Sequence, residues 1–109
     1  MNSWIDLRGA SGTLYRYTLA EDAKPKTPVS GTYIYLRAAK PEPQVIYAAD
    51  TLNLSEGALE LWPQAVKEFG ATHLYLRLNV ARAARKAELA DLFDVETPPM
   101  NEKAPSEST

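Results

Sequence analysis

The stretch Thr72-His73-Leu74-Tyr75-Leu76-Arg77-Leu78-Asn79-Val80 carries the clearest structural signal in the chain. Leucine or valine stands at every even position from 74 to 80, with histidine, tyrosine, arginine and asparagine between them. Successive side chains of a β-strand point to opposite faces of the sheet, so this period of two predicts a strand with one apolar face. Such a strand needs partners, and other segments of the chain alternate in the same way.

Those other segments form two predicted hairpins. Residues 4–8 and 13–19 flank the turn Gly9-Ala10-Ser11-Gly12, whose small residues suit a tight connection. Residues 31–37 and 44–49 are joined by a connection that contains two prolines. Proline is excluded from the interior of helices and central strands, so this connection is predicted to be a loop.

Two segments show helical spacing instead. Apolar residues recur every three or four positions between 59 and 69, and Gly70 favours a helix end. Pro63 is tolerated only in a first turn, so we expect a short or broken turn near 54–61 and a helix from about 63 to 69. Residues 81–93 lack glycine and proline and predict a second helix.

The order of these elements predicts an α+β fold, in which helices pack on a small antiparallel or mixed β-sheet. A chain of 109 residues has room for one domain. We expect that domain over 1–101, with an N-terminal hairpin at 3–20 and a core at 31–101. The polar residues 102–109 predict a disordered tail.

Composition excludes several kinds of site. The chain has no cysteine and one histidine, which excludes disulfides, thiolate metal sites and metal sites built from several histidines. Its net charge of −2 argues against a strong non-specific hold on nucleic acid, because such affinity comes from cations that neutralise phosphates. No apolar run approaches the ~20 residues of a membrane span, and no signal peptide is expected. We therefore expect a cytoplasmic protein with no membrane partner.

Two motifs suggest a family. Gly31-Thr32-Tyr33 opens one predicted strand and Ile46-Tyr47-Ala48-Ala49 ends the next, which resembles the paired motif of the GIY-YIG nuclease domain. The segment 92–101, with two prolines before its asparagine, is similar to the closing pattern of that family. The turn at 70–73 and the N-terminal hairpin resemble a short bacterial branch of it.

The resemblance implies a small antiparallel sheet flanked by helices, and metal-dependent cleavage of a DNA phosphodiester. It implies that Tyr33 and Tyr47 lie at the attacking water and that Asn101 supports the site. It also implies an arginine for the phosphate on the helix after the second motif, and a glutamate on the last helix for a divalent metal. A hard cation needs a carboxylate oxygen, and the developing phosphorane charge needs a fixed cation.

The chain departs from this pattern where the chemistry is most demanding. Ala49 replaces the glycine of the second motif, and Glu56-Gly57 occupies the place of the arginine. Leu89 falls at the position of the metal glutamate, and leucine cannot hold a hard cation. Glu88 and Asp91 are close in sequence, but each residue turns a helix by ~100°, so neither points where position 89 does. We expect no metal cofactor, with Mg²⁺ bound only if Glu88 or Asp91 serves an altered site.

The remaining candidate residues have simpler interpretations beside the functional ones. Four arginines are candidates for binding a phosphate: Arg37, Arg77, Arg82 and Arg85. For the basic residues of the last helix we favour a solvated helix face, on which Arg85 or Lys86 lies beside Glu88 and Asp91, over a track that binds phosphate. The tyrosines fall in predicted strands, where aromatic residues are favoured anyway. His73 at a strand start is more typical of an exposed or hydrogen-bonded residue than of a general base.

The sequence therefore predicts a degenerate GIY-YIG-like domain that acts as a binding or scaffold module without nuclease activity. Two alternatives stay open. One is an endonuclease with an altered site, in which Glu88 or Asp91 takes the metal and Arg37 or Arg77 replaces the missing cation. The other is a protein-interaction or homodimer module that uses the edge of the N-terminal hairpin or the tyrosine-bearing face. The partner, nucleic acid or protein, is left undecided.

Overall fold

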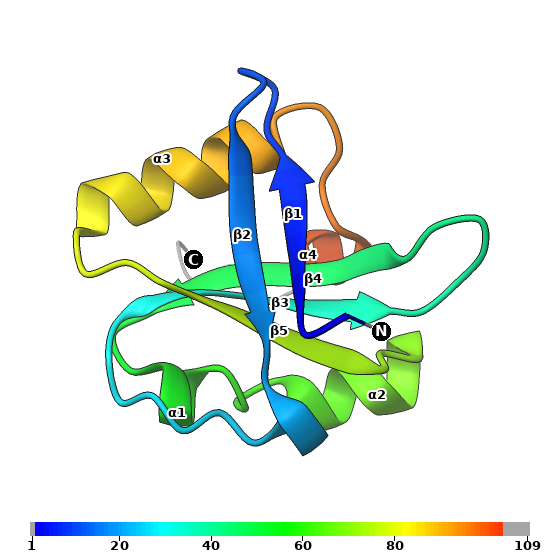
Figure 1. Cartoon of the computed structure of the whole chain (residues 1–109). Helices are drawn as coiled ribbons and strands as arrows, with labels where there is room; N and C mark the ends of the chain where they lie inside the picture. Colours follow the sequence, from blue (N-terminus) through cyan, green and yellow to red (C-terminus); the bar gives the residue numbers. More distant parts are fainter. Residues whose placement is uncertain (1, 104–109) are drawn as a thin grey trace.

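A computed structural model describes residues 2–103, which fold into one five-stranded sheet with helices on both sides (Figure 1). All pairings are antiparallel, and the strand order is β1-β2-β5-β3-β4. The strands are β1 (Trp4–Arg8), β2 (Leu14–Leu19), β3 (Gly31–Arg37), β4 (Gln44–Thr51) and β5 (His73–Leu78). The predicted α+β class is confirmed, and the sheet is antiparallel rather than mixed.

The helices follow the predicted order, with two short helical elements added. The broken turn and the helix around Pro63 are α1 (Leu54–Gly57) and α2 (Trp62–Phe69), and the second predicted helix is α3 (Arg82–Leu92). A short 3-10 turn, η1 (Glu21–Ala23), follows β2. The sequence pattern predicts no helix after residue 93, but α4 (Pro99–Lys103) forms there, because proline is well suited to the first position of a helix. Helix α4 includes the first two residues of the predicted tail, and 104–109 lie outside the described residues.

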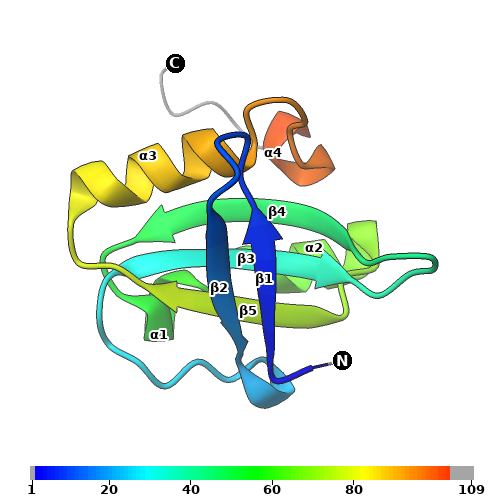
Figure 2. The same ribbon diagram turned by 45° about the horizontal axis from the view of Figure 1, so that its top comes forward.

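The sheet is strongly curled. Strands β5, β3 and β4 form a layer that is paired along most of its length, whereas β2 pairs with β5 through Thr18 with Leu76 and Leu19 with Tyr75. The β1-β2 hairpin then leaves that layer and crosses over one of its faces (Figures 1 and 2). The central strand β3 is thereby covered on both sides, and its residues 31–36 are all buried. Tyr75, which the alternation placed on a polar face, is fully buried beneath the hairpin for the same reason.

The two faces of the layer have separate cores. We call one the tyrosine face: Tyr33, Tyr35, Tyr47 and Leu74 pack there with residues of α1, α2 and α4. We call the other the hairpin face: Ile34, Leu36 and Tyr75 pack there with Tyr17 of the hairpin and with the apolar side of α3. Within residues 2–103, every helix is too short or too polar to cross a bilayer.

Candidate functional site

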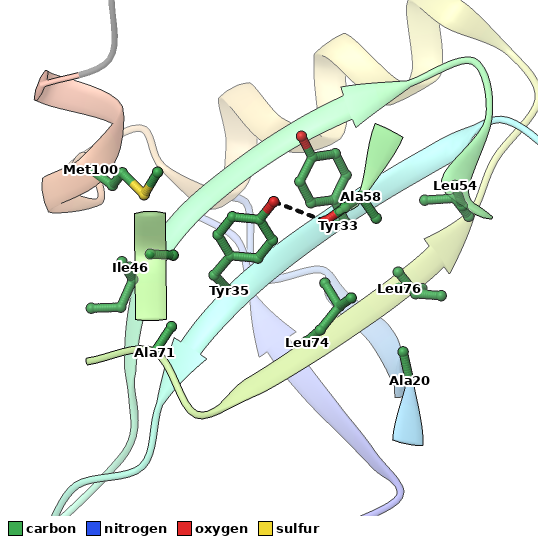
Figure 3. Packing of buried hydrophobic residues seen from close by; sticks show 11 residues of the cluster. Ala20, Tyr33, Tyr35, Ile46, Leu54, Ala58, Ala71, Leu74, Leu76 and Met100 are labelled. Atoms are coloured by element: carbon green, nitrogen blue, oxygen red, sulfur yellow. Dashed lines mark hydrogen bonds between the residues drawn. The ribbon is translucent and has the colours of Figure 1, made fainter. Parts of the chain in front are cut away.

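The two motif tyrosines lie together on the tyrosine face, in an aromatic cluster under α1 and α2. Figure 3 shows Tyr33 and Tyr35 of this cluster and the hydrogen bond from the Tyr35 hydroxyl to Ala58. The ring centroids of Tyr33 and Tyr47 are 6.1 Å apart, and the ring of Tyr35 lies 5.5 Å and 5.4 Å from them. Trp62 of α2 packs edge-on against Tyr35 at 5.2 Å. A β-bulge at Ile46 shifts the register, so that Ile46 and Tyr47 both face this cluster.

Burial controls the chemistry of these hydroxyls. Tyr33 is 4% exposed, and burial, followed by the neighbouring Tyr35 and Tyr47, raises its pKa well above the usual value. Burial also raises the pKa of Tyr35, whose hydroxyl donates to the Ala58 carbonyl at 2.8 Å and accepts from the Leu61 amide at 3.3 Å. The phenols of Tyr33 and Tyr35 therefore stay protonated, and the Tyr35 hydroxyl fixes the connection between α1 and α2.

Asn101 lies at the outer edge of β4 rather than over the tyrosine rings. Its Oδ1 accepts from the Ala48 amide at 2.9 Å, and its Nδ2 donates to the Ala48 carbonyl at 2.8 Å. An amide side chain that bonds both groups of one residue replaces the next strand of a sheet at that point. Asn101 thus attaches α4 to the sheet.

Leu89, the residue at the predicted metal position, lies on the opposite side of the sheet from the tyrosines. It packs against the hairpin-face cluster, together with Leu92 and Phe93 of the same helix and helix end. The sheet layer therefore separates position 89 from Tyr33 and Tyr47. Among residues 2–103, no three His, Cys, Asp or Glu side chains form a group that could hold a metal ion.

Glu88 is held by two partners on the hairpin face. Its carboxylate accepts from Arg77 Nε at 2.9 Å and from a second Arg77 nitrogen at 3.2 Å, and Asn79 Nδ2 donates to it at 3.1 Å. The hydrogen bond from Arg77 to Glu88 raises the pKa of the guanidinium further. A planar guanidinium on a carboxylate is a strong geometry, and here it ties α3 to β5.

Asp91 supports the turn of the β1-β2 hairpin. Its carboxylate accepts from the Ser11 hydroxyl at 2.7 Å, the Ser11 amide at 2.8 Å and the Tyr15 hydroxyl at 2.8 Å. These hydrogen bonds lower the pKa of the carboxyl below its usual value. The tip of the hairpin is therefore fixed to the C-terminal end of α3, as Figure 2 shows for the two elements.

The four candidate arginines are dispersed. Arg85, expected on a solvated helix face, is 2% exposed; its Nε lies 3.2 Å from Asp50 Oδ2, and it also donates to the Asn79 carbonyl at 3.0 Å. Arg77 bonds Glu88, as above. Arg37 donates to the side chain of Gln44 near the β3-β4 turn, and Arg82 is exposed at the start of α3.

At three other positions considered from the sequence, the local structure explains which residue is present. A Cβ at Gly31 would lie 2.3 Å from the Arg77 carbonyl oxygen, and one at Gly57 would lie 2.0 Å from Thr51 Oγ1. Both glycines therefore permit a close approach of neighbouring chain. The single histidine, His73, bonds Thr72 Oγ1 through Nδ1 at 2.8 Å, and burial lowers its pKa.

Sequence reasoning missed a groove at the end of β5, of about 540 Å³, between that strand and the connection after η1. Leu78 lies in it, and although the alternation assigned Leu78 to an apolar face, the side chain is 58% exposed. Lys24 and Lys26 form part of the opposite wall. In the sequence, the signal for this wall is the pair of lysines on either side of Pro25. The segment around them shows neither the alternation of a strand nor the spacing of a helix.

Comparison with known proteins identifies no relative. No protein-family model matches the chain, and searches of curated proteins and of solved structures also give no match.

Proposed function

We propose that this chain is a GIY-YIG-like binding or scaffold module without nuclease activity. One observation carries the proposal. The tyrosine pair and position 89 lie on opposite faces of the β5-β3-β4 layer, so their side chains do not converge on one phosphate. A phosphodiesterase of this resemblance needs its water-positioning, phosphate-binding and metal-binding groups around a single reacting centre.

The contacts of the candidate residues support the same proposal. Asn101 bonds the backbone of β4, Glu88 bonds Arg77, and Asp91 bonds the hairpin turn. Each of these polar groups thus has an internal partner that ties one element to another. Metal binding by Glu88 or Asp91 would have to break these contacts.

A nicking assay tests the proposal. Purified protein is incubated with supercoiled plasmid in Mg²⁺ and, separately, in Mn²⁺, and the fraction of nicked plasmid is measured over time. We expect no nicking above a buffer control. Nicking by the native chain that is lost in Tyr47→Phe and kept in the exposed control Glu68→Gln would overturn the proposal. It would instead support the altered-site endonuclease, and Glu88→Gln and Asp91→Asn would then identify the metal ligand.

A second candidate function is a homodimer through the outer edge of β1. Strand β1 ends the sheet order, and within the described range 2–103 its one paired strand is β2. Trp4 on β1 is 46% exposed, and the Arg16 guanidinium lies 3.7 Å from the centre of its ring. An unpaired edge strand offers backbone groups to a second chain. Light scattering across a concentration series would detect the dimer, and Trp4→Lys should shift it to monomer. A monomer at every concentration excludes this candidate.

A further inference from the structure

The last residues of β5 have a strand partner on one side only, among the residues that the structure describes. Strand β2 pairs with β5 only as far as Thr18 with Leu76, while β5 continues to Leu78. The backbone amide of Ala20 donates to the Leu74 carbonyl, so Leu74, and by alternation Leu76 and Leu78, direct their backbone groups toward β2. Among the pairs formed within residues 2–103, none joins Leu78 to β2, which turns away toward the hairpin face, where its Arg16 carbonyl accepts from the Arg77 side chain at 3.3 Å. The N–H and C=O of Leu78 are therefore open to a further strand.

The groove beside this edge has an apolar and a basic side. Leu76 and the exposed Leu78 line it from β5, and Lys24 and Lys26 line it from the connection after η1. Neither lysine takes part in the ion pairs found within residues 2–103, which join Asp6 to Arg16, Glu88 to Arg77, and Asp50 to α3. Glu21 and Asp22 of η1 also line the groove, which therefore presents two carboxylates as well as the two lysines.

The basic wall is fixed to the body of the protein. The Ser55 amide donates to the Thr27 carbonyl at 3.0 Å, and the Leu54 amide donates to the Val29 carbonyl at 2.9 Å. Pro25 is buried and has its φ fixed by its ring. A ligand would enter a preformed groove, which lowers the entropic cost of binding.

Building on the proposed binding function, we propose that this groove binds an acidic peptide in extended conformation, which adds as a strand to the edge of β5. Backbone hydrogen bonds to Leu78 supply the strand pairing, and an apolar peptide side chain covers Leu78. Acidic peptide side chains pair with Lys24 and Lys26. Strand addition of this kind uses backbone groups for affinity and alternate side chains for specificity.

Fluorescence anisotropy with a labelled octapeptide of alternating valine and glutamate tests the proposal. Binding should weaken about fivefold in the double variant Lys24→Gln/Lys26→Gln, which removes two exposed ion pairs. The matched control Lys40→Gln/Lys67→Gln has the same net charge and should stay within about twofold, because both lysines are exposed elsewhere. Leu78→Ser should weaken binding several-fold. All variants are first checked for native circular dichroism.

Two further probes separate strand addition from simple charge attraction. The same peptide with N-methylated backbone lacks the amide donors and should not bind. In hydrogen exchange, the Leu78 amide should become protected when the unmethylated peptide is bound. A valine and lysine octapeptide should bind more weakly than the glutamate peptide.

The inference is overturned if the glutamate peptide does not bind at millimolar concentration. It is equally overturned if the methylated peptide binds as well as the parent, or if the two double variants weaken binding alike. These outcomes leave the proposed function standing when the same preparation does not nick plasmid. Metal-dependent nicking would overturn the proposed function whatever the peptide does.

Discussion

On the tyrosine face, rings from β3 and β4 pack beneath α1 and α2, and the Tyr35 hydroxyl donates to the Ala58 carbonyl and accepts from the Leu61 amide. On the hairpin face, an apolar cluster is bordered by charged contacts that tie α3 to the strands and to the hairpin turn. Both faces are buried, and within residues 2–103 the ion pairs that join a covering helix to the layer lie on the hairpin face.

The residues that carry the resemblance to a nuclease are divided between these two faces. The motif tyrosines belong to the packed aromatic face, whereas the carboxylates of α3 belong to the network on the other face. Glu88 and Asp91 are anchors of α3 and of the hairpin. Substitutions on the tyrosine face should therefore destabilise the fold through lost packing, and those on the hairpin face through lost electrostatic contacts.

The largest effect should come from the tyrosine face. Tyr35 is fully buried, and Tyr35→Ala should lower the free energy of unfolding by about 4 kcal/mol, because it removes an aromatic ring from a packed core. Tyr35→Phe should cost about 1–2 kcal/mol through the lost hydroxyl contacts. Urea unfolding followed by circular dichroism gives both values. Leu14→Ala, at a half-exposed position, is the control, and an equal loss there would contradict the core assignment.

On the hairpin face, the expected loss is electrostatic. Asp50→Ala removes the carboxylate that pairs with the buried Arg85 and should cost about 3 kcal/mol in the same assay, because a buried charge is left without its partner. The double variant Asp50→Ala/Arg85→Met removes both charges and should recover most of that loss. The tyrosine-face variants have no such rescue. If Asp50→Ala costs no more than the exposed control Asp94→Ala, the ion pair does not hold α3.

The smallest effect should be at the hairpin turn, and it should depend on pH. The hydrogen bonds to Asp91 lower its pKa in the folded state, so its stabilising contribution is present above the unfolded pKa, near 4, and is lost as pH falls through the folded value. Asp91→Asn should lower the unfolding midpoint at pH 7, and the difference from the native chain should shrink on acidification. A difference independent of pH would mean that the carboxylate charge is irrelevant.

Much of the fold was predictable from local pattern. The alternation at 72–80, the small-residue turn at 9–12 and the position of Pro63 predicted β5, the first hairpin and the break between α1 and α2. These features depend on neighbours in sequence, where the period of two, turn chemistry and the geometry of proline act directly. The start of α4 at Pro99 was missed because a proline in the sequence can mark either the end of a helix or the first position of one.

The site was less predictable because it depends on which face each element covers. Nothing in the spacing of Leu14 to Leu19 shows that β2 leaves β5 after two residue pairs and crosses the hairpin face. That crossing buries Tyr75 and places α3 opposite the tyrosines. The contacts of Arg85 with Asp50 and of Asn101 with Ala48 join residues far apart in the chain, and neither partner carries a local signal for the other.

Whether position 89 and the tyrosines share a face can be measured directly by nuclear Overhauser effects from the Leu89 methyl groups in the native chain. The structure predicts cross-peaks to residues of the hairpin-face cluster, and none to the rings of Tyr33 or Tyr47. Cross-peaks from Leu89 to Tyr47 would place the predicted metal position beside the motif tyrosines, and would contradict the separation on which the proposed loss of nuclease activity depends.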